Sequence, residues 1–155
     1  MRLWRLSSAR RARDFSGGYG LLHSGRWNTR GRAVTYGSTV PSLAALEKRV
    51  HVTDPTLLPP QSMVEYEVPD DLPQRVVDFK TLPSDWAQRE VDTQTLGDRW
   101  IDARTEPLLI VPSVIMPLPN APDRNVLINH QHPEVSRIRI ARVVQFALDP
   151  RLFQP

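Results

Sequence analysis

The positions of glycine and proline constrain the fold of this chain more than any other feature. Six of the seven glycines lie between Gly17 and Gly37, and all fifteen prolines lie at or after Pro41. Proline ends helices and is kept out of central strands, so the chain after Pro41 is expected to form short elements joined by stiff turns. The glycine-rich segment before it allows the backbone to approach a ligand closely.

Short apolar runs and alternating patterns predict six or seven strands and two or three helices. In the first helix, Ser42 is the expected N-cap, and Leu43, Leu46 and Val50 form one apolar stripe. In the last strand, Arg142 interrupts an otherwise apolar face. The predicted strands cover residues 3–6, 33–37, 63–68, 75–79, 108–111, 126–128 and 138–148, and the helices cover 41–50 and 96–104. We therefore expect one compact α+β domain with a mixed sheet over residues 1–155.

The segment from Met1 to Asp14 permits two interpretations. It is rich in arginine, contains two serines and has no acidic residue before Asp14, as in many targeting peptides. The run Leu3-Trp4-Arg5-Leu6 also has the pattern of a first strand. We favour the strand over the targeting peptide.

Composition excludes several classes of protein. The chain has no cysteine, so disulfide frameworks, thiolate zinc sites and cysteine nucleophiles are excluded. No stretch approaches the roughly 18 apolar residues that a membrane-spanning helix needs. The lack of cysteine is consistent with a reducing cytoplasm, where we expect the protein to act, with no membrane partner.

The charges are strongly segregated along the chain. Formal net charge is +3, and 18 of the 20 basic residues are arginine. Residues 1–50 carry a net charge of +8, residues 51–110 carry −7 and residues 111–155 carry +2. Because the arginine fork suits phosphate and carboxylate groups, the first third indicates an anionic ligand. Nucleic acid, a phosphorylated metabolite and an acidic partner protein all fit this pattern.

Two apparent motifs have simpler explanations. The run Gly18-Tyr19-Gly20 begins like a dinucleotide-binding loop but lacks the third glycine and the long helix that follows. His130 and His132 lie close together, yet a zinc site normally needs a third protein ligand. We interpret the two histidines as part of a surface loop, and we expect no metal.

Four residues are individually ambiguous. Arg26 stands beside Trp27 in a glycine-rich loop, where it could bind a pyrophosphate or simply lie at the surface. Tyr36 lies in a strand and Glu47 beside the apolar stripe of a helix, and both positions are common in folds without a ligand. Ser113 follows a buried strand, where it could contact a ligand or cap a turn.

The order and spacing of these residues resemble the RES domain family over nearly the whole chain. The family takes its name from an arginine, a glutamate and a serine, which match Arg26, Glu47 and Ser113. One departure is His130, which stands where the family usually has proline. The matching motifs are Gly25-Arg26-Trp27-Asn28, Gly31, Tyr36-Gly37-Ser38, Leu43-Ala44-Ala45-Leu46-Glu47, Leu82-Pro83-Ser84-Asp85-Trp86, Gly97-Asp98-Arg99-Trp100, Val111-Pro112-Ser113, Leu127-Ile128-Asn129, His132-Pro133 and Asp149-Pro150-Arg151-Leu152.

The resemblance implies a function, a fold and a site. RES-domain proteins are toxins of bacterial type II toxin–antitoxin pairs, have a fold similar to ADP-ribosylating toxins, and deplete NAD+. The resemblance implies that NAD+ is a substrate cleaved at the nicotinamide–ribose bond, and that the ADP-ribose passes to water, phosphate or a protein. Arg26, Tyr36 and Glu47 are then the expected catalytic residues. Arg26, Tyr36, Ser113 and Asn129 are the residues expected to bind NAD+.

The resemblance also implies a partner, an Xre-type helix-turn-helix antitoxin that blocks the active-site cleft. Nucleic acid would then be contacted only through the antitoxin. A different function also fits the arginines of the first third, namely a basic nucleic-acid-binding module without catalysis. That module would use Arg10, Arg11, Arg13, Arg30 and Arg32. The acidic middle third argues against it, because it interrupts an extended basic face.

Overall fold

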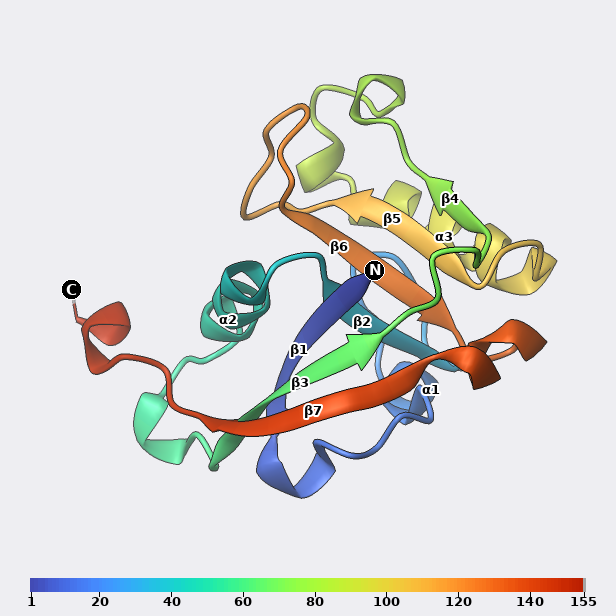
Figure 1. Ribbon diagram of the computed structural model, residues 1–155. Coiled ribbons are helices and arrows are strands. Elements are labelled where there is room, and N and C mark those ends of the chain that lie inside the picture. The colour runs from blue at the N-terminus through green and yellow to red at the C-terminus, as the bar shows by residue number, and fades with distance from the viewer. Residues whose placement is uncertain (155) are drawn as a thin grey trace.

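The computed structural model describes residues 1–154, which form one seven-stranded mixed sheet with helices packed on it (Figure 1). The strand order is β4-β5-β6-β2-β1-β3-β7, and the pairing is antiparallel except between β4 and β5. The strands are β1 (Arg2–Ser8), β2 (Val34–Ser38), β3 (Gln61–Glu67), β4 (Gln74–Val76), β5 (Leu108–Pro112), β6 (Arg124–Asn129) and β7 (Arg139–Phe146). The α-helices are α1 (Gly18–Leu22), α2 (Pro41–Val50) and α3 (Glu90–Ala103). The predicted α+β mixed-sheet class is confirmed.

Short 3-10 helices occupy many of the proline-rich connections, as the proline distribution predicted. Three of them begin with proline in their first turn. They are η1 (Ala9–Arg11), η2 (Pro55–Leu57), η3 (Phe79–Thr81), η4 (Trp86–Gln88), η5 (Pro133–Arg137) and η6 (Pro150–Phe153). Within residues 1–154, no helix has the length and apolar character needed to cross a bilayer.

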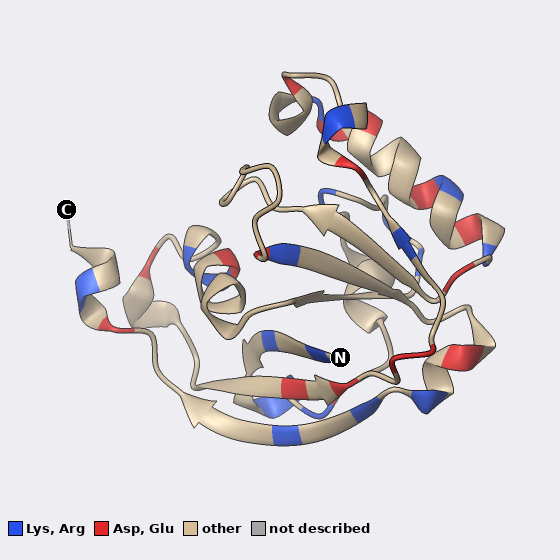
Figure 2. Ribbon diagram, turned by 45° about the horizontal axis from the view of Figure 1, so that its top comes forward, with Lys and Arg blue, Asp and Glu red and all other residues tan. Residues whose placement is uncertain are grey.

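The sheet consists of two groups of strands that meet at a narrow junction. One group is β4-β5-β6-β2 and the other is β1-β3-β7, and the register between β1 and β2 contains the single pair Trp4 and Ser38. Beyond this pair the two groups diverge (Figures 1 and 2). Helix α2 packs against both β1 and β2 and therefore lies at the junction.

Alternation along the strands gives the sheet an apolar core on each face. The core on one face contains residues of β1 and β3 and alternate residues of β5 and β6. Its buried residues include Leu3, Val64, Tyr66, Leu108, Val126 and Ile128. Helix α3 covers the other face (Figure 1). The buried residues of that face include Trp27, Val34, Trp100, Ile101, Leu109, Val111 and Leu127. The predicted strand at residues 3–6 lies inside β1 and contributes Leu3 and Leu6 to the core.

Two predictions for the helix at 41–50 are wrong. Ser42 is not the N-cap, because Pro41 already occupies the first turn and Val40 is the cap residue, with no capping hydrogen bond from its side chain. Val50 does not belong to a buried stripe, since it is 56% exposed at the end of the helix. Leu43 and Ala44 provide the buried contact instead.

Helix α3 begins six residues before the predicted start at Leu96. Its first turn carries Glu90 and Asp92, whose negative charges stabilise a helix N-terminus. The helix ends where Arg104 adopts a left-handed conformation with φ 53°. The first half of the helix shows no helical period of apolar residues, because its polar side chains contact a loop rather than an apolar core. The sequence pattern therefore placed the start of the helix too late.

A β-bulge explains why Arg142 interrupts the apolar pattern of β7. The register between β3 and β7 shifts between Glu65 and Tyr66, so that Glu65 pairs with Arg142 whereas Tyr66 pairs with Ile140. The extra residue, Ala141, moves Arg142 to the outer face, where its guanidinium lies 3.1 Å from the Glu65 carboxylate. The predicted single apolar face over 138–148 is therefore wrong, and Val144 is 47% exposed.

Candidate functional site

Glu47 lies on α2, and its carboxylate is held by two side chains of the sheet, from the end of β5 and from β6. Its Oε1 accepts a hydrogen bond from Ser113 Oγ at 2.9 Å and from Asn125 Nδ2 at 2.5 Å. Within residues 1–154, Oε2 has no hydrogen-bond partner. One oxygen is thus fixed by the fold, and the other remains available to a ligand.

The antiparallel pairing of β5 with β6, and of β6 with β2, brings these groups together. Asn125 lies opposite Val111 on one side and opposite Ser38 on the other. Ser113 directly follows β5, two residues beyond Val111, so it projects from the same face. Ser38 Oγ donates to Asn125 Oδ1 at 3.0 Å. We call Ser38, Glu47, Ser113 and Asn125 the Glu47 cluster.

The loop that carries Arg26 is fixed by direct contact with α3. Gln94 Nε2 donates to the carbonyl of Gly25 at 2.9 Å, and Thr93 Oγ1 donates to the carbonyl of Arg26 at 2.7 Å. Gly97 permits this approach, because a Cβ on it would lie 1.8 Å from the carbonyl oxygen of Trp27. Residues 93–97 of α3 therefore hold this loop in place.

The guanidinium of Arg26 is only partly engaged by the protein. Its Nη1 donates to the carbonyl of Ala87 at 2.9 Å, and its Nη2 lies 3.9 Å from the exposed carboxylate of Glu90. The side chain is 30% exposed. Since guanidinium has five N–H donors, several remain for an anionic ligand.

Tyr36 connects the loop that carries Arg26 to β2. Its hydroxyl donates to Asn28 Oδ1 at 2.7 Å and accepts from the backbone N–H of Trp27 at 3.1 Å. Burial raises the pKa of Tyr36, so the hydroxyl keeps its proton. Gly25 leaves room for the Tyr36 hydroxyl, since a Cβ at this position would lie only 2.7 Å from it.

Hydrogen bonds and neighbouring positions on β2 relate the loop that carries Arg26 to Glu47. Trp27 contacts Tyr36 through the hydrogen bond above, and Tyr36 and Ser38 lie two residues apart on the same face of β2. Ser38 is bonded to Asn125, which in turn donates to Glu47. The Arg26 loop, Tyr36, Glu47 and Ser113 therefore lie on the same face of the sheet, which α3 also covers.

Asn129 does not join this group. It lies at the other end of β6, four residues or about 13 Å from Asn125. Its side chain is fully buried, donates to the carbonyl of Ile101 at 2.9 Å and accepts from the backbone N–H of Gln131 at 3.0 Å. These hydrogen bonds support the fold, and the binding of NAD+ by Asn129 stays a prediction, whereas Asn125 lies beside Glu47.

The two histidines that could have suggested a metal serve separate purposes. His130 packs edge-on against Phe15 with ring centroids 4.7 Å apart, and its Nε2 is 2.8 Å from Thr35 Oγ1. Burial lowers the pKa of His130 to about 4, so its ring is neutral near pH 7. The Nδ1 of His132 accepts from the backbone N–H of Glu134 at the start of η5. Among residues 1–154, no group of three metal-ligating side chains is present.

Helix α3, on which acidic and basic residues are interspersed, neutralises part of the positive charge of the first third (Figure 2). Arg32 lies 2.7 Å from Asp102 and 3.2 Å from Asp98. Asp98 also accepts from the backbone N–H and the hydroxyl of Thr29 at 2.9 and 2.7 Å. We call Thr29, Arg32, Asp98 and Asp102 the Arg32 cluster.

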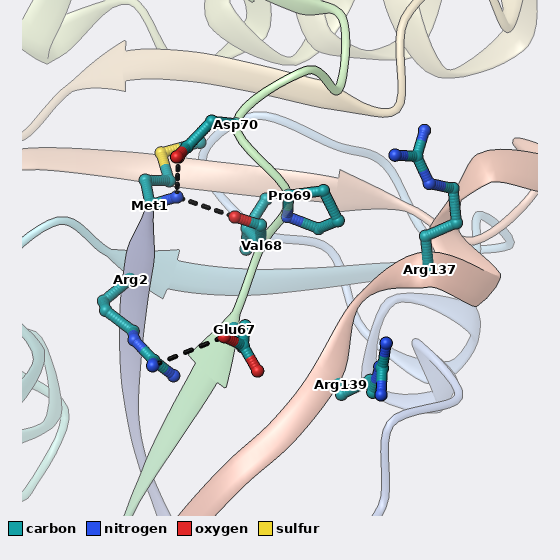
Figure 3. A pocket seen from close by; sticks show the side chains of 8 residues that line it. All are labelled: Met1, Arg2, Glu67, Val68, Pro69, Asp70, Arg137 and Arg139. Atoms are coloured by element: carbon teal, nitrogen blue, oxygen red, sulfur yellow. Dashed lines mark hydrogen bonds and ion pairs between the residues drawn. The ribbon is translucent and has the colours of Figure 1, made fainter.

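A surface cavity beside the N-terminus lies away from the predicted site. Figure 3 shows this cavity of about 530 Å³, whose lining includes Met1, Glu67 and Asp70 but none of the predicted site residues. The Met1 amine binds Asp70, and Arg2 lies 3.4 Å from Glu67. Its charged groups thus largely satisfy one another. Another cavity, of about 440 Å³, is lined by Phe15, His130 and residues around η5.

Comparison with protein families decides the relationship that the motifs indicated. The RES domain matches residues 2–149. This chain belongs to the RES domain family. The match spans every residue of the two clusters and every strand of the sheet.

Known proteins match this chain along most of their length. The chain is 33% identical to the Prs ADP-ribosylating toxin of Sphingobium sp. (strain YBL2), covering 97% of this chain and 96% of the relative. It is 39% identical to Toxin Res of Pseudomonas putida, covering 99% and 100%. Among solved structures, the M. tuberculosis MbcT–MbcA toxin–antitoxin complex contains a similar fold, with a TM-score of 0.69 and 16% identity over 98% of this chain and 86% of that chain.

Sequence reasoning missed Asn125, whose amide donates to Glu47. It directly precedes the predicted strand at 126–128 and carries no pattern of its own. The available signal was its place at the start of a buried strand that pairs with the strand ending at Ser38. Using that signal requires the strand pairing, which the sequence pattern does not provide.

Proposed function

We propose that this chain is a single-domain bacterial toxin that cleaves NAD+ between nicotinamide and ribose and transfers the ADP-ribose. The observation that carries the proposal is the Glu47 carboxylate, held through Oε1 by Ser113 and Asn125 with Oε2 left unbonded within residues 1–154. The name of the Sphingobium relative, an ADP-ribosylating toxin, supports the same chemistry. The acceptor is water, phosphate or a protein.

The chemistry explains why a fixed carboxylate suits this reaction. The bond between ribose C1′ and the nicotinamide nitrogen breaks, and its electron pair stays on nicotinamide, which leaves as a neutral molecule. An oxocarbenium-like ribose develops, and an acceptor oxygen then bonds to C1′ and loses its proton. A preorganised negative charge beside C1′ stabilises this transition state, because it needs no reorganisation as the positive charge develops. Glu47 is the residue that supplies this charge.

The other predicted residues receive roles that fit their contacts. Arg26 pairs with the pyrophosphate through the N–H groups that Ala87 does not use. Tyr36 offers its half-buried ring to the nicotinamide or ribose, since its hydroxyl is already bonded to Asn28. Ser113 acts on Glu47, to which its hydroxyl donates. A direct contact of Ser113 with ribose stays a prediction.

We infer that the chain acts in the bacterial cytoplasm and is neutralised there by an antitoxin, which we expect to be of the Xre helix-turn-helix type. The similar fold in a toxin–antitoxin complex supports an antitoxin partner. An acidic or terminal-carboxylate segment of that partner would mimic the phosphates and bind Arg26.

The decisive experiment follows the release of free nicotinamide from NAD+ by the purified protein. Glu47→Gln is the test variant, because its amide oxygen can still accept hydrogen bonds from Ser113 and Asn125 while the negative charge is lost. We expect the wild-type protein to release nicotinamide and the variant to be about 100-fold slower or worse, with an unchanged melting temperature. Added phosphate, or a cell extract, then identifies the acceptor.

Two results would contradict the proposal. If Glu47→Gln consumed NAD+ as fast as the wild-type protein, the carboxylate would not stabilise the reaction. If the wild-type protein released no nicotinamide but bound nucleic acid with a steep dependence on salt, the basic-module alternative would replace the toxin.

A further inference from the structure

The amide of Asn125 has only one orientation that satisfies both of its neighbours. A carboxylate accepts hydrogen bonds and cannot donate them, so Asn125 must turn its Nδ2 toward Glu47. Its Oδ1 then faces Ser38, whose hydroxyl can donate, as the 3.0 Å contact between them requires. A flipped amide would place an acceptor against an acceptor at Glu47.

The backbone fixes both ends of this arrangement. Ser38 and Asn125 are directly opposite each other in the antiparallel pairing of β2 and β6, where side chains on one face lie within contact distance. Ser38 is 3% exposed and Asn125 is half-buried, so water does not readily replace either partner. The donor that Asn125 offers to Glu47 is therefore preorganised by the sheet.

Ser113, which directly follows β5, adds a second donor to the same oxygen. Its hydroxyl oxygen accepts from the backbone N–H of Ile115 at 3.0 Å, which leaves the hydroxyl hydrogen for Glu47. No Lys, Arg or His side chain within residues 1–154 forms an ion pair with Glu47. The two donors alone therefore set the rotation of the carboxylate.

We propose that Asn125, oriented by Ser38, is a positioning residue that directs Oε2 of Glu47 toward the substrate. The inference rests on the proposed function and adds two residues to it. Without the Asn125 donor the carboxylate would retain only the Ser113 bond and could rotate about its terminal torsion, which has a broad energy profile. The developing charge on ribose would then meet a disordered anion.

The test is Asn125→Asp, which keeps the shape of the side chain but replaces the donor by a second carboxylate. Two facing carboxylates cannot both remain ionised at low cost, so they share a proton and the apparent pKa of the pair rises. Only the protonated Asp side chain can donate to Glu47. At pH 7.5 we expect kcat for nicotinamide release to fall about tenfold or more, and to recover as the pH is lowered toward 5.

The wild-type protein and a matched variant are measured over the same pH range. Asn120→Asp makes the same chemical change at an exposed turn residue with φ 64°, where either side chain is tolerated, and we expect the wild-type pH profile. A folded Asn125→Asp with the wild-type pH profile would overturn the proposal. A wild-type protein that releases no nicotinamide would overturn the proposed function itself, and this inference with it.

A second variant decides the matter if Asn125→Asp does not fold. Ser38→Ala removes the hydroxyl that orients the Asn125 amide and adds no charge. We expect kcat to fall severalfold with KM nearly unchanged, and the pH profile to keep its wild-type shape. A kcat equal to that of the wild-type protein would show that the orientation of Asn125 does not matter.

Discussion

The Glu47 cluster and the Arg32 cluster are both built from polar groups far apart in the sequence, yet they differ in how completely their oxygens are used. In the Arg32 cluster, both oxygens of Asp98 and both oxygens of Asp102 have partners. In the Glu47 cluster, both donors act on Oε1 and leave Oε2 without one in the described chain. A saturated ionic cluster supports the fold, whereas a half-used carboxylate is available for chemistry.

The same contrast separates two arginines of one loop. Arg32 binds Asp98 and Asp102, and its hydrogen bonds to Asp102 raise the pKa of the guanidinium further above its ordinary value. Arg26 has one short bond, to the carbonyl of Ala87, and a distant carboxylate. The net charge of the first third therefore overstates the positive charge available to a ligand, and the pairing with α3 decides which arginine remains free.

The largest effect in the Arg32 cluster is expected from Asp98→Ala. The change leaves the backbone N–H of Thr29 and one edge of Arg32 without partners at a half-buried position, which should cost about 2–3 kcal/mol. For a chain of this length that corresponds to a melting temperature lower by roughly 5–10 °C in thermal denaturation. We expect kcat for nicotinamide release at low temperature to change less than about threefold, since the Glu47 cluster is untouched.

Asp92→Ala is the matched control for that change, because Asp92 lies on the same helix but is half-exposed and pairs with Arg89 at the surface. Its effect should stay within about 0.5 kcal/mol. If Asp98→Ala melted at the wild-type temperature and lost activity instead, the Arg32 cluster would not be a purely stabilising one, and the contrast with the Glu47 cluster would fail.

An intermediate effect is expected from Arg26→Ala. Removing an arginine that binds phosphates in the ground state and in the transition state should raise KM for NAD+ about tenfold and change kcat little. The melting temperature should fall only slightly, because a single partly exposed hydrogen bond is lost. Steady-state kinetics beside Arg30→Ala, an exposed arginine of the same loop, provide the comparison. An equal effect of the two changes would show that Arg26 does not bind the substrate.

The smallest effect concerns His130, which lies on the opposite face of the sheet from the Glu47 cluster. Burial lowers its pKa to about 4 from an ordinary value of 6.5, so the unfolded chain binds the proton more readily than the folded one. Stability from this group is fully present above about pH 6.5 and is lost as the pH falls toward 4.

The change His130→Gln should therefore flatten the decline of the melting temperature between pH 7.5 and pH 4.5. His51→Gln, at an exposed position, should leave that decline as in the wild-type protein. Equal slopes for the wild-type protein and His130→Gln would contradict the buried, neutral imidazole. Nicotinamide release at neutral pH should change little, because His130 contributes to stability and not to the reaction.

The fold was predictable where local pattern and tertiary environment agree. Apolar runs located β5 and β6, and alternation located β3, because the buried residues of these strands repeat as the pleat requires. The pattern failed where the environment changes along one element. The start of α3 packs on a polar loop, and the bulge at Ala141 moves part of β7 to the other register.

The site was predictable to a similar degree and for a related reason. The order of motifs indicated Arg26, Tyr36, Glu47 and Ser113, which lie on one face of the sheet and whose roles stay predictions. It also indicated Asn129, which the fold places at the far end of β6. Choosing between Asn125 and Asn129 depends on which end of β6 meets Ser38, and strand register is a non-local property.

The sequence by itself determined that the elements would be short, that glycine and arginine would share one loop, and that the chain follows the motif order of the RES domain. These properties follow from local sterics and from residue order. Only the tertiary structure decided which charges cancel and which carboxylate oxygen stays unbonded. The net charge of a segment is a sum over residues, whereas the availability of Arg26 or of Glu47 Oε2 depends on partners that distant strands and α3 bring within hydrogen-bond distance.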